Sequence, residues 1–438
     1  MSDKLYNEIM IKIRNLNSWL KKEKVTAQMS ALYSNNEGVL DFQRTRYEHL
    51  SCLFHTQFPK YSDIRVFSTS GRTEIAGNHT DHQRGHVLCA SVDLDIVAMV
   101  SPNQENIIRL KSEGYETIDV IDLSILTPIE SESYHSASLI RGIAAEFKNR
   151  GLNIGGFDAY TTSKVPKGSG LSSSAAFEIM IATILNYLYN DGTIPPVTMA
   201  LVSQYAENHF FGKPCGLMDQ CGCSVGGIMT IDFQTPGAPI VDAISVDFED
   251  YGYYLIISNT GGSHADLNDD YASIPMDMKK VAQFFGKDVL RDVSKDKMMD
   301  SIPMLRAKVG DKAILRAIHF FSDDEKVTLQ ADALKINDID TFLKLVNESG
   351  ISSWTCLQNI YSLKLPEEQS IALGLAISNN ILKGRGACRV HGGGFAGTVQ
   401  AFVPKDLVDG YIQAMEAVFG KNTSWKLRIR NIPTTEIF

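Results

Sequence analysis

Residues Gly168-Ser169-Gly170-Leu171-Ser172-Ser173-Ser174-Ala175 form a stretch made almost wholly of glycine and serine. It follows an alternating, strand-like segment at residues 157–162 and leads into a run from Ala175 to Tyr189 that is apolar around most of a helix's circumference. A helix of that kind is expected to be deeply buried. The order of strand, small-residue turn and buried helix favours a mixed α/β fold.

The same stretch has the properties of an anion site. Small residues let the backbone approach a ligand closely, and the first N–H groups of a helix lack partners inside it and lie at the positive end of its dipole. Serine hydroxyls add donors or a ligand for magnesium. A Ser-rich N-cap is the alternative, but only Leu171 among residues 168–174 is neither glycine nor serine. We predict phosphate binding, although the chain has no Walker A sequence, G-x-x-x-x-G-K-[ST].

Helical and strand-like patterns alternate over the rest of the chain. The first sixty residues have helical periodicity, including Asp41 to Phe54. Strands are predicted at Ile64–Phe67, Val87–Val100, Tyr253–Ser258 and Thr398–Val403, and helices at Met276–Phe285, Lys312–Leu334 and Asp338–Ser349. We therefore predict two intimate α/β lobes that part near residues 215–235.

Composition excludes several classes of protein. The chain carries 42 Lys and Arg against 51 Asp and Glu, a net charge of −9 without a basic block, which makes it a poor binder of nucleic acid or anionic membranes. No run approaches the roughly 18 apolar residues that span a bilayer, and no signal-peptide pattern is seen, so we expect a cytoplasmic protein. The seven cysteines are scattered and odd in number, which favours reduced thiols over a disulfide framework.

A second glycine-rich segment, Gly392 to Gly397, satisfies G-x-G-x-x-G. A dinucleotide-binding fingerprint requires a helix after this pattern, whereas residues 398–403 are strand-like. We interpret the segment as a flexible loop beside a substrate, with a plain tight turn as the alternative.

Two further segments contain candidate functional side chains. His79, Asp81, His82 and His86 lie close together and suit either a metal or the hydroxyls of a sugar, and spacing alone does not decide between these. Asp219 lies among glycine and methionine residues, so it is either a helix cap or a functional carboxylate.

Taken together, the four segments resemble the galactokinases of the GHMP kinase superfamily from about residue 60 to 438. The motifs G-R-x₄-G-x-H-T-D, P-x-G-x-G-L-S-S-S-A, C-G-L-M-D-Q and G-G-G-F-x-G carry this resemblance. It implies a two-lobed α+β fold with the active site between the lobes. Residues 1–60 would be a helical extension, 61–220 the N-terminal lobe with the sugar motif and phosphate loop, and 221–438 the C-terminal lobe, whose last strand can return to the first.

The resemblance also implies a role for each site residue. Asp219 would take the proton from the anomeric hydroxyl, and Arg72 would neutralise Asp219 and the moving phosphoryl group. The ATP phosphates would be cradled by Gly168, Ser169, Gly170, Leu171, Ser172, Ser173 and Ser174. Mg²⁺ would be held by Ser174 and Glu207, and the ring hydroxyls by Asn78, His79, Asp81 and Tyr271. A sugar role for His79 and Asp81 displaces the metal interpretation.

The departures from the family pattern concern the sugar. Asn78 stands where galactokinases carry Glu, His82-Gln83 replaces Tyr-Asn, Ser70 replaces a proline, and Ala396 replaces a glycine. A Glu at 78 would repel a sugar carboxylate at 4 Å by roughly 1–4 kcal/mol, and Asn removes that repulsion. Galacturonokinases are likewise neutral at this position.

The resemblance therefore predicts an ATP- and magnesium-dependent kinase that converts galactose to galactose 1-phosphate and ADP. Galacturonate is the alternative substrate because of Asn78. A sensor of sugar and nucleotide without turnover is disfavoured because Asp219, Arg72 and the phosphate-loop serines are kept. A metal hydrolase is the third class of protein considered. Elemental analysis that found stoichiometric zinc in the protein would support it. The expected partners are a small-molecule sugar and ATP, with no nucleic acid or membrane partner, and we expect a monomer.

Overall fold

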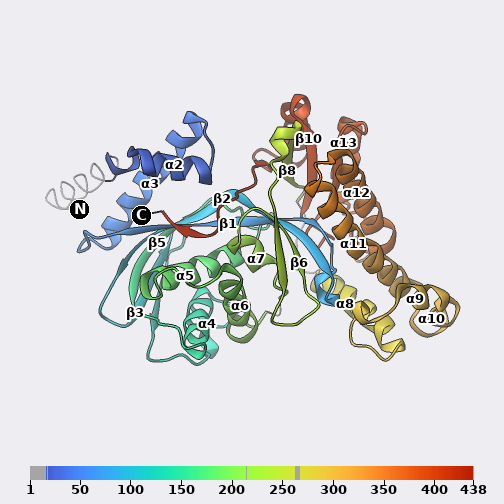
Figure 1. The fold of residues 1–438 in the computed structure, drawn as a ribbon, viewed down its shortest axis with the longest axis horizontal. Helices are drawn as coiled ribbons and strands as arrows, with labels where there is room; N and C mark the ends of the chain where they lie inside the picture. Colours follow the sequence, from blue (N-terminus) through green and yellow to red (C-terminus); the bar gives the residue numbers. More distant parts are fainter. Residues whose placement is uncertain (1–15, 17, 214, 262–266, 438) are drawn as a thin grey trace.

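The fold consists of two lobes, each built on its own sheet (Figure 1). The computed structural model describes residues 16, 18–213, 215–261 and 267–437. The larger sheet contains β1 (Arg65–Ala76), β2 (His86–Pro102), β3 (Ile107–Ser112), β4 (Ile118–Asp122), β5 (Phe157–Ser163), β6 (Ile228–Asp232), β7 (Ile240–Ile244) and β12 (Thr435–Glu436). The smaller contains β8 (Tyr253–Asn259), β9 (Ala387–His391), β10 (Thr398–Pro404) and β11 (Ser424–Leu427). The predicted two-lobed α/β fold is confirmed.

The antiparallel pair β1–β2 is the centre of the larger sheet, whose main strand order is β12-β1-β2-β5-β3-β4. The first part of β2 also pairs with β6, and its last part pairs with β5. The register between β1 and β2 shifts between Ser70 and Arg72 and again between Glu74 and Ala76. Such irregularities bend a strand and redirect its side chains, and here they flank Arg72 and Glu74.

Helices cover one face of the larger sheet and pack around the smaller one. The first set is α4 (Ser136–Asn149), α5 (Ser173–Tyr189), α6 (Pro196–Ala206) and α7 (Met218–Ser224). The second is α8 (Asn268–Phe284), α9 (Lys295–Asp300), α10 (Ile302–Val309), α11 (Asp311–Lys335), α12 (Ile339–Ser352), α13 (Ser370–Leu382) and α14 (Val408–Phe419). The helices predicted at 276–285, 312–334 and 338–349 correspond to α8, α11 and α12.

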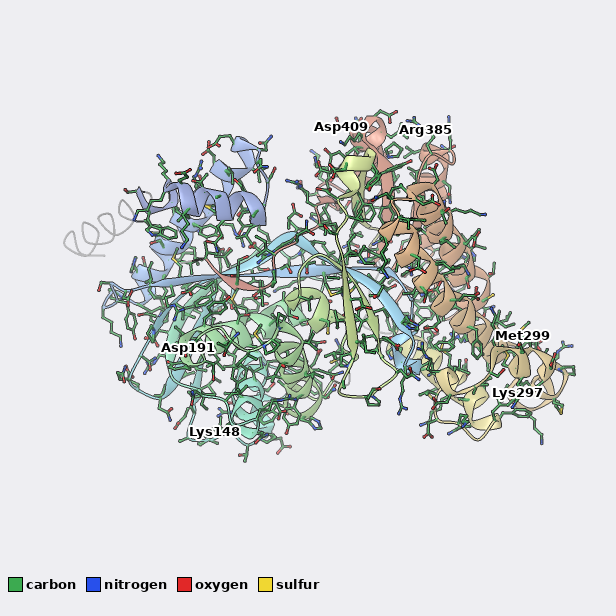
Figure 2. All side chains as sticks on the ribbon, in the orientation of Figure 1. Lys148, Asp191, Lys297, Met299, Arg385 and Asp409 are labelled. Carbon is green, nitrogen blue, oxygen red and sulfur yellow. The ribbon has the colours of Figure 1, made fainter. Side chains whose placement is uncertain are left out.

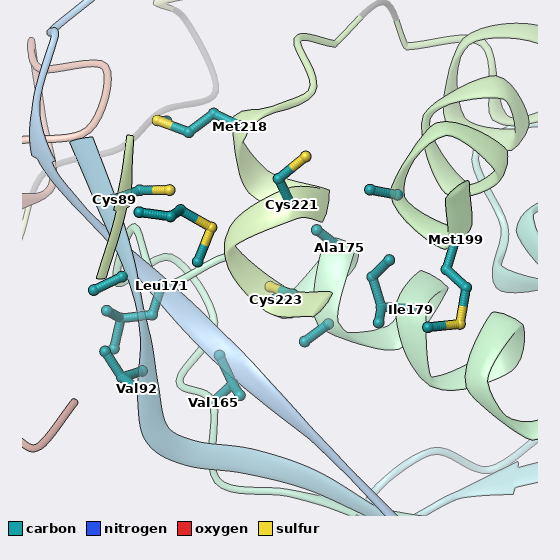
Figure 3. Packing of buried hydrophobic residues seen from close by; sticks show 14 of the residues in the cluster. Cys89, Val92, Val165, Leu171, Ala175, Ile179, Met199, Met218, Cys221 and Cys223 are labelled. Carbon is teal, nitrogen blue, oxygen red and sulfur yellow. The ribbon is translucent and has the colours of Figure 1, made fainter. Parts of the chain in front are cut away.

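The predicted buried helix is α5, and its apolar residues lie in the main core. Figure 3 shows Ala175 and Ile179 of α5 close to Cys221 and Cys223 of α7. Leu171, from the turn before α5, is fully buried in the same cluster. All seven cysteines are free thiols. The apolar contacts of Leu171 and Ala175 therefore anchor the glycine–serine turn to the main core.

Two N-terminal helices, α2 (Glu23–Leu32) and α3 (Glu37–Gln57), cover the opposite face of the larger sheet (Figure 1). Tyr47 and Phe54 of α3 belong to one cluster with Val66 of β1 and Val97 of β2, whereas Phe67 and Ala98, their neighbours in sequence, face the main core. Alternate residues of a strand point to opposite faces, so α3 closes a second core layer. The helix predicted at Asp41–Phe54 is confirmed, while residues 1–15 and 17 lie outside the described part.

A buried ionic network centred on Asp95 fastens these helices to the sheet. Asp95 accepts hydrogen bonds from Tyr33 Oη at 2.7 Å, Arg46 Nη1 at 2.5 Å and Ser68 Oγ at 2.5 Å. Arg430, near the C-terminus, lies 3.8 Å from the same carboxylate. Burial alone would raise the pKa of Asp95, but the two arginines outweigh it and hold that pKa below its ordinary value. Asp95 is thus an ionised acid that joins both chain ends to β2.

The sheets do not divide at the predicted position between residues 220 and 221. Strands β6 and β7 extend the larger sheet as far as Ile244, and β12 returns to pair with β1. We propose that the N-terminal lobe extends to about Ile244, and that the C-terminal lobe begins near Tyr253, the first residue of β8.

Several charged side chains lie at the edges of the molecule, away from the junction between the lobes. Lys148 and Asp191 are exposed at the outer side of the first lobe, and Lys297 and Arg385 are exposed at the ends of the second (Figure 2). Within the described residues, the search for a helix of membrane-spanning length and apolarity finds none.

We expect Asp95→Asn to lower the free energy of unfolding by about 3–5 kcal/mol, because Arg46 and Arg430 would then be buried without their carboxylate. Urea denaturation measures this. The control is Glu37→Gln, which breaks an ion pair of a 70%-exposed carboxylate with Arg44 and should cost under about 1 kcal/mol. Equal losses in the two variants would contradict the bracing role of the network.

Candidate active site

The site lies where β1, the glycine–serine turn, α7 and the β9–β10 loop meet between the lobes. Thr73 Oγ1 of β1 lies 3.0 Å from His391 Nε2 of β9, and Arg389 Nη2 of β9 donates to Glu74 Oε1 at 3.0 Å. Arg389 and Glu74 are 0% and 4% exposed at their side chains. Contacts between buried, polar groups therefore fix the position of one lobe against the other here.

Arg72 and Asp219 form an ion pair at the centre of the site. Arg72 Nη2 and Nε donate to Asp219 Oδ1 at 2.6 and 3.0 Å, and Ser172 Oγ donates to Oδ2 at 2.5 Å. Arg72 also donates to the carbonyl of Gly170. Ser172 adopts a left-handed φ of +57°, which non-glycine residues rarely do outside functional or over-determined sites. The turn is therefore shaped to hold the carboxylate of Asp219.

Asp219 is ionised and open to a ligand. The surrounding protein would by itself raise its pKa by removing water, but Arg72 and the Ser172 hydroxyl outweigh this and lower the pKa below its ordinary value. The side chain retains 37% of its surface. It lies in the first turn of α7, after the N-cap Leu217, and bonds Arg72 and Ser172 rather than the helix backbone. The helix-cap interpretation is therefore wrong.

The phosphate-loop residues divide into two groups. Ser169 Oγ donates to the carbonyl of Pro166 at 2.7 Å, and the carbonyl of Leu171 accepts from Arg72 N at 3.1 Å, so these residues hold the turn. Ser174 is exposed in the first turn of α5, and Ser173 is partly exposed. A Cβ on Gly168 would meet nothing within 4 Å. The open side of the turn thus consists of small residues and a helix N-terminus, which suits phosphate oxygens.

His79 and Asp81 present hydrogen-bond acceptors beside Asp219's helix. His79 Nε2 lies 3.0 Å from the carbonyl of Gly393, which assigns the proton to that nitrogen, and Nδ1 is buried without a partner. Burial and the neighbouring His82 lower the pKa of His79 to about 4, so the ring is neutral. Asp81 Oδ2 would lie 2.3 Å from a Cβ on Gly216, so a larger residue there would displace the Asp81 carboxylate. Both predicted sugar ligands therefore have acceptors for hydroxyl groups.

The contacts of Asn78 indicate a different role from the predicted sugar contact. It is fully buried, its Nδ2 donates to Glu74 Oε1 at 2.9 Å and to Gly392 O at 2.7 Å, and its Oδ1 accepts from Asn359 Nδ2 at 2.8 Å. Both amide hydrogens and the oxygen are used by protein groups. In this arrangement Asn78 holds the loop between β1 and β2, residues 77–85, from behind and contributes no free donor to a sugar. We call residues 77–85 the sugar loop.

Glu74 is a site residue that our sequence analysis missed. Burial raises its pKa to about 7, against the opposing effect of Arg389 and Arg72. It shares one face of β1 with Arg72, two residues earlier, because side chains of a strand repeat every second residue. An arginine and a glutamate two residues apart within a mostly buried strand are the sequence signal that would have identified Glu74.

Tyr271 lies on α8 and contacts the glycine loop. Its Oη donates to the carbonyl of Gly394 at 2.7 Å, and a Cβ on Gly393 would lie 2.5 Å from its ring. The loop is followed by β10 rather than by a helix, so it is no dinucleotide fingerprint. Its carbonyls contact Asn78, His79 and Tyr271, and it therefore joins the sugar motif to the second lobe.

The predicted magnesium ligands lie on neighbouring helices. Ser174 lies in the first turn of α5, and Glu207 directly follows α6, with which α5 is in contact. Glu207 is buried, accepts from Gln220 Nε2 at 2.9 Å and lies 3.6 Å from Lys213 Nζ. A hydroxyl and a carboxylate suit Mg²⁺, which keeps several waters.

The histidines of the sugar motif do not converge on a metal. His86 Nδ1 lies 3.1 Å from Asp324 and its Nε2 lies 3.3 Å from Asp232, whereas His79 contacts Gly393. Within the described residues, no group of three or more His, Cys, Asp or Glu side chains could hold a metal ion.

Two family models match the regions that form this site. Residues 138–227 match the GHMP kinases N terminal domain, and residues 53–102 match the galactokinase galactose-binding signature. The first match covers the glycine–serine turn, Glu207 and Asp219, and the second covers Arg72, Glu74 and the sugar loop.

Solved structures share the fold at low sequence identity. Galactokinase from Lactococcus lactis, complexed with galactose, is 20% identical with a TM-score of 0.73, over 87% of this chain and 97% of its own. Mevalonate kinase from Methanococcus jannaschii is 16% identical with a TM-score of 0.59, over 84% and 99%. Phosphomevalonate kinase from Streptococcus pneumoniae, in complex with phosphomevalonate and AMPPNP, is 12% identical with a TM-score of 0.55, over 82% and 99%.

Residues 138–227 thus form a GHMP kinase N-terminal domain within a two-lobed fold shared with solved GHMP kinases, and this supports assignment to that class of ATP-dependent kinases. Within that class it is galactokinase-like, because the galactose-binding signature matches its β1–β2 region.

Glu74 gives a pH-dependent contribution to stability. Between pH 4.5 and about 7 the folded protein keeps a proton that the unfolded chain releases, so the free energy of unfolding falls as pH rises through that window. Relative to Glu74→Gln, we expect the wild type to lose about 2–3 kcal/mol from pH 4.5 to 7. Urea denaturation at several pH values measures the difference. If the free energies of unfolding of the two proteins changed in parallel with pH, this expectation would be contradicted.

Proposed function

We propose that the protein transfers the γ-phosphoryl group of ATP to the anomeric hydroxyl of galactose, giving galactose 1-phosphate and ADP. The observation that carries this proposal is the partly exposed, ionised Asp219, held by Arg72 and Ser172 between the helix N-terminus of α5 and the sugar loop. A proton acceptor, a cation and an anion-binding turn are thereby adjacent.

Phosphoryl transfer depends mainly on positioning and charge stabilisation, which suits these residues. As the bond from the sugar oxygen to phosphorus forms and the bond to ADP breaks, the hydroxyl proton passes to Asp219. Because Arg72 lowers the pKa of Asp219, the carboxylate is a weak base, and it gains the proton late, when the sugar oxygen has become acidic. Arg72 then faces the charge of the transferring phosphoryl group.

The polar groups around the turn fit ATP and Mg²⁺: the hydrogen-bond donors suit phosphate, and the oxygen ligands suit the metal ion. The N-terminus of α5 and the hydroxyls of Ser173 and Ser174 would face the phosphates, and Ser174 and Glu207 would hold Mg²⁺, which supplies neutralisation of phosphate charge when bound. The buried, unpartnered Oε1 of Glu178 next to Glu207's partner Gln220 agrees with a cation in this region. We further propose a cytoplasmic monomer.

Galactose is favoured over galacturonate by Glu74. The neutral Asn78 admits a sugar acid in principle, but its amide is bonded to the Glu74 carboxylate at 2.9 Å. Above the raised pKa of Glu74, about 7, a negative charge is therefore still present behind the sugar loop, and a sugar carboxylate close to it would be repelled. His79 Nδ1 and Asp81 accept from hydroxyls, which supports a neutral hexose.

We expect Asp219→Asn to lower kcat by about 10²–10⁴ because the positioned proton acceptor is lost, with little change in ATP affinity. Coupled measurement of ADP release with galactose tests this. Asp191→Asn, at an exposed position on the far side of the first lobe, is the control. Near-wild-type turnover in Asp219→Asn would remove that residue from the proposed role.

The choice of sugar should depend on pH. Since the pKa of Glu74 is raised to about 7, its charge grows as pH rises through neutrality, and repulsion of galacturonate grows with it. We expect the ratio of kcat/KM for galactose to that for galacturonate to increase from pH 6 to 8, and to stay flat in Glu74→Gln. A ratio independent of pH in the wild type would refute this account of specificity.

A further inference from the structure

Two buried carboxylates lie on either side of one amide behind the phosphate-binding turn. Gln220 Nε2 donates to Glu178 Oε2 at 3.0 Å and to Glu207 Oε2 at 2.9 Å. Glu178 and Gln220 are fully buried, and Glu207 is 4% exposed. Among the described residues, Lys213 is the one cation within 4 Å of either carboxylate. The pair is therefore under-compensated, although buried carboxylates require positive partners.

Two oxygen atoms of this group have no hydrogen-bond partner. Glu178 Oε1 and Gln220 Oε1 are both buried and unpartnered. Buried polar atoms are nearly always bonded, so such atoms in a functional region call for a ligand. Nearby Asp219 and Ser172 already satisfy each other, and they do not explain these oxygens.

The unpartnered oxygens lie on the same elements as the proposed magnesium ligands. Glu178 follows Ser174 by one turn of α5, so the two share a helix face. Gln220 directly follows Asp219 on α7, and α5, α6 and α7 contact one another. Carboxylate and amide oxygens are the ligands that hard divalent cations prefer.

We propose that Glu178 and Gln220 supply oxygen ligands to the divalent cation that Ser174 and Glu207 hold. The cation class is Mg²⁺ or Mn²⁺, and the inference rests on the proposed function, in which that cation accompanies ATP. Gln220 has a double role: its Nε2 spaces the two carboxylates, and its Oε1 faces the cation. Glu178 is thus a residue of the metal site that motif spacing alone did not reveal.

Binding of Mn²⁺ alone to the full chain tests the proposal, with free Mn²⁺ followed by electron paramagnetic resonance. We expect Glu178→Gln to weaken Mn²⁺ affinity about tenfold or more, and Gln220→Met to weaken it in the same direction. The control is Glu146→Gln, which changes a buried glutamate of α4 that pairs with Arg150, and this variant should bind Mn²⁺ like the wild type. Wild-type affinity in Glu178→Gln overturns the proposal, as does a wild type that takes up no Mn²⁺.

A second pair of variants separates this inference from the proposed function and from misfolding. Asp219→Asn should keep Mn²⁺ affinity within about threefold while losing turnover, so loss of kinase activity and loss of the metal site are distinguishable. Should Glu178→Gln not fold, Glu178→Asp keeps the charge and shortens its reach. Mn²⁺ should then raise the thermal midpoint of Glu178→Asp less than that of the wild type, and an equal rise overturns the proposal.

Discussion

The ion pair between Arg72 and Asp219 is the constraint on which the rest of the site depends. Arg72 reaches Asp219 because β1 is irregular at this point, and its backbone N–H is fixed by the carbonyl of Leu171. Two glycines make the approach possible: a Cβ on Gly71 would lie 2.9 Å from Leu171 O, and one on Gly222 would lie 2.7 Å from Arg72 Cβ. The pair thus locks a strand, a turn and a helix into one unit, and it keeps Asp219 charged.

Local chemistry made much of the fold and part of the site predictable. The apolar circumference of α5 and the glycine–serine turn before it indicated a buried helix with an open N-terminus, and both were found. The role of the first sixty residues was not predictable in the same way. The link that ties α3 to the sheet joins Arg46 to Asp95, 49 residues apart, and helical periodicity carries no information about such a partner.

The same limit explains the difference at Asn78. Comparison with a family motif identified the position as unusual, yet its partners are Gly392 and Asn359, 314 and 281 residues away. Considered by itself, the Asn at position 78 suggests that the sugar site has lost a negative charge. The folded chain, however, places the carboxyl group of Glu74 beside Asn78. Glu178 and Gln220 were overlooked for a related reason, since a glutamate in an apolar helix gives no sign of which oxygen will lack a partner.

The two ends of the proposed reaction are joined through a single strand. Arg72, which faces the phosphoryl side, and Glu74, which supports the sugar loop, are separated only by Thr73, and all three are tied to other elements: Arg72 to α7, Thr73 and Glu74 to β9. A strand held at consecutive residues cannot shift at one end without moving the other. In the proposed reaction, recognition of the sugar and placement of the proton acceptor would therefore be mechanically coupled. Such coupling would offset the cost of removing the charges of Arg72 and Glu74 from water in an otherwise buried strand.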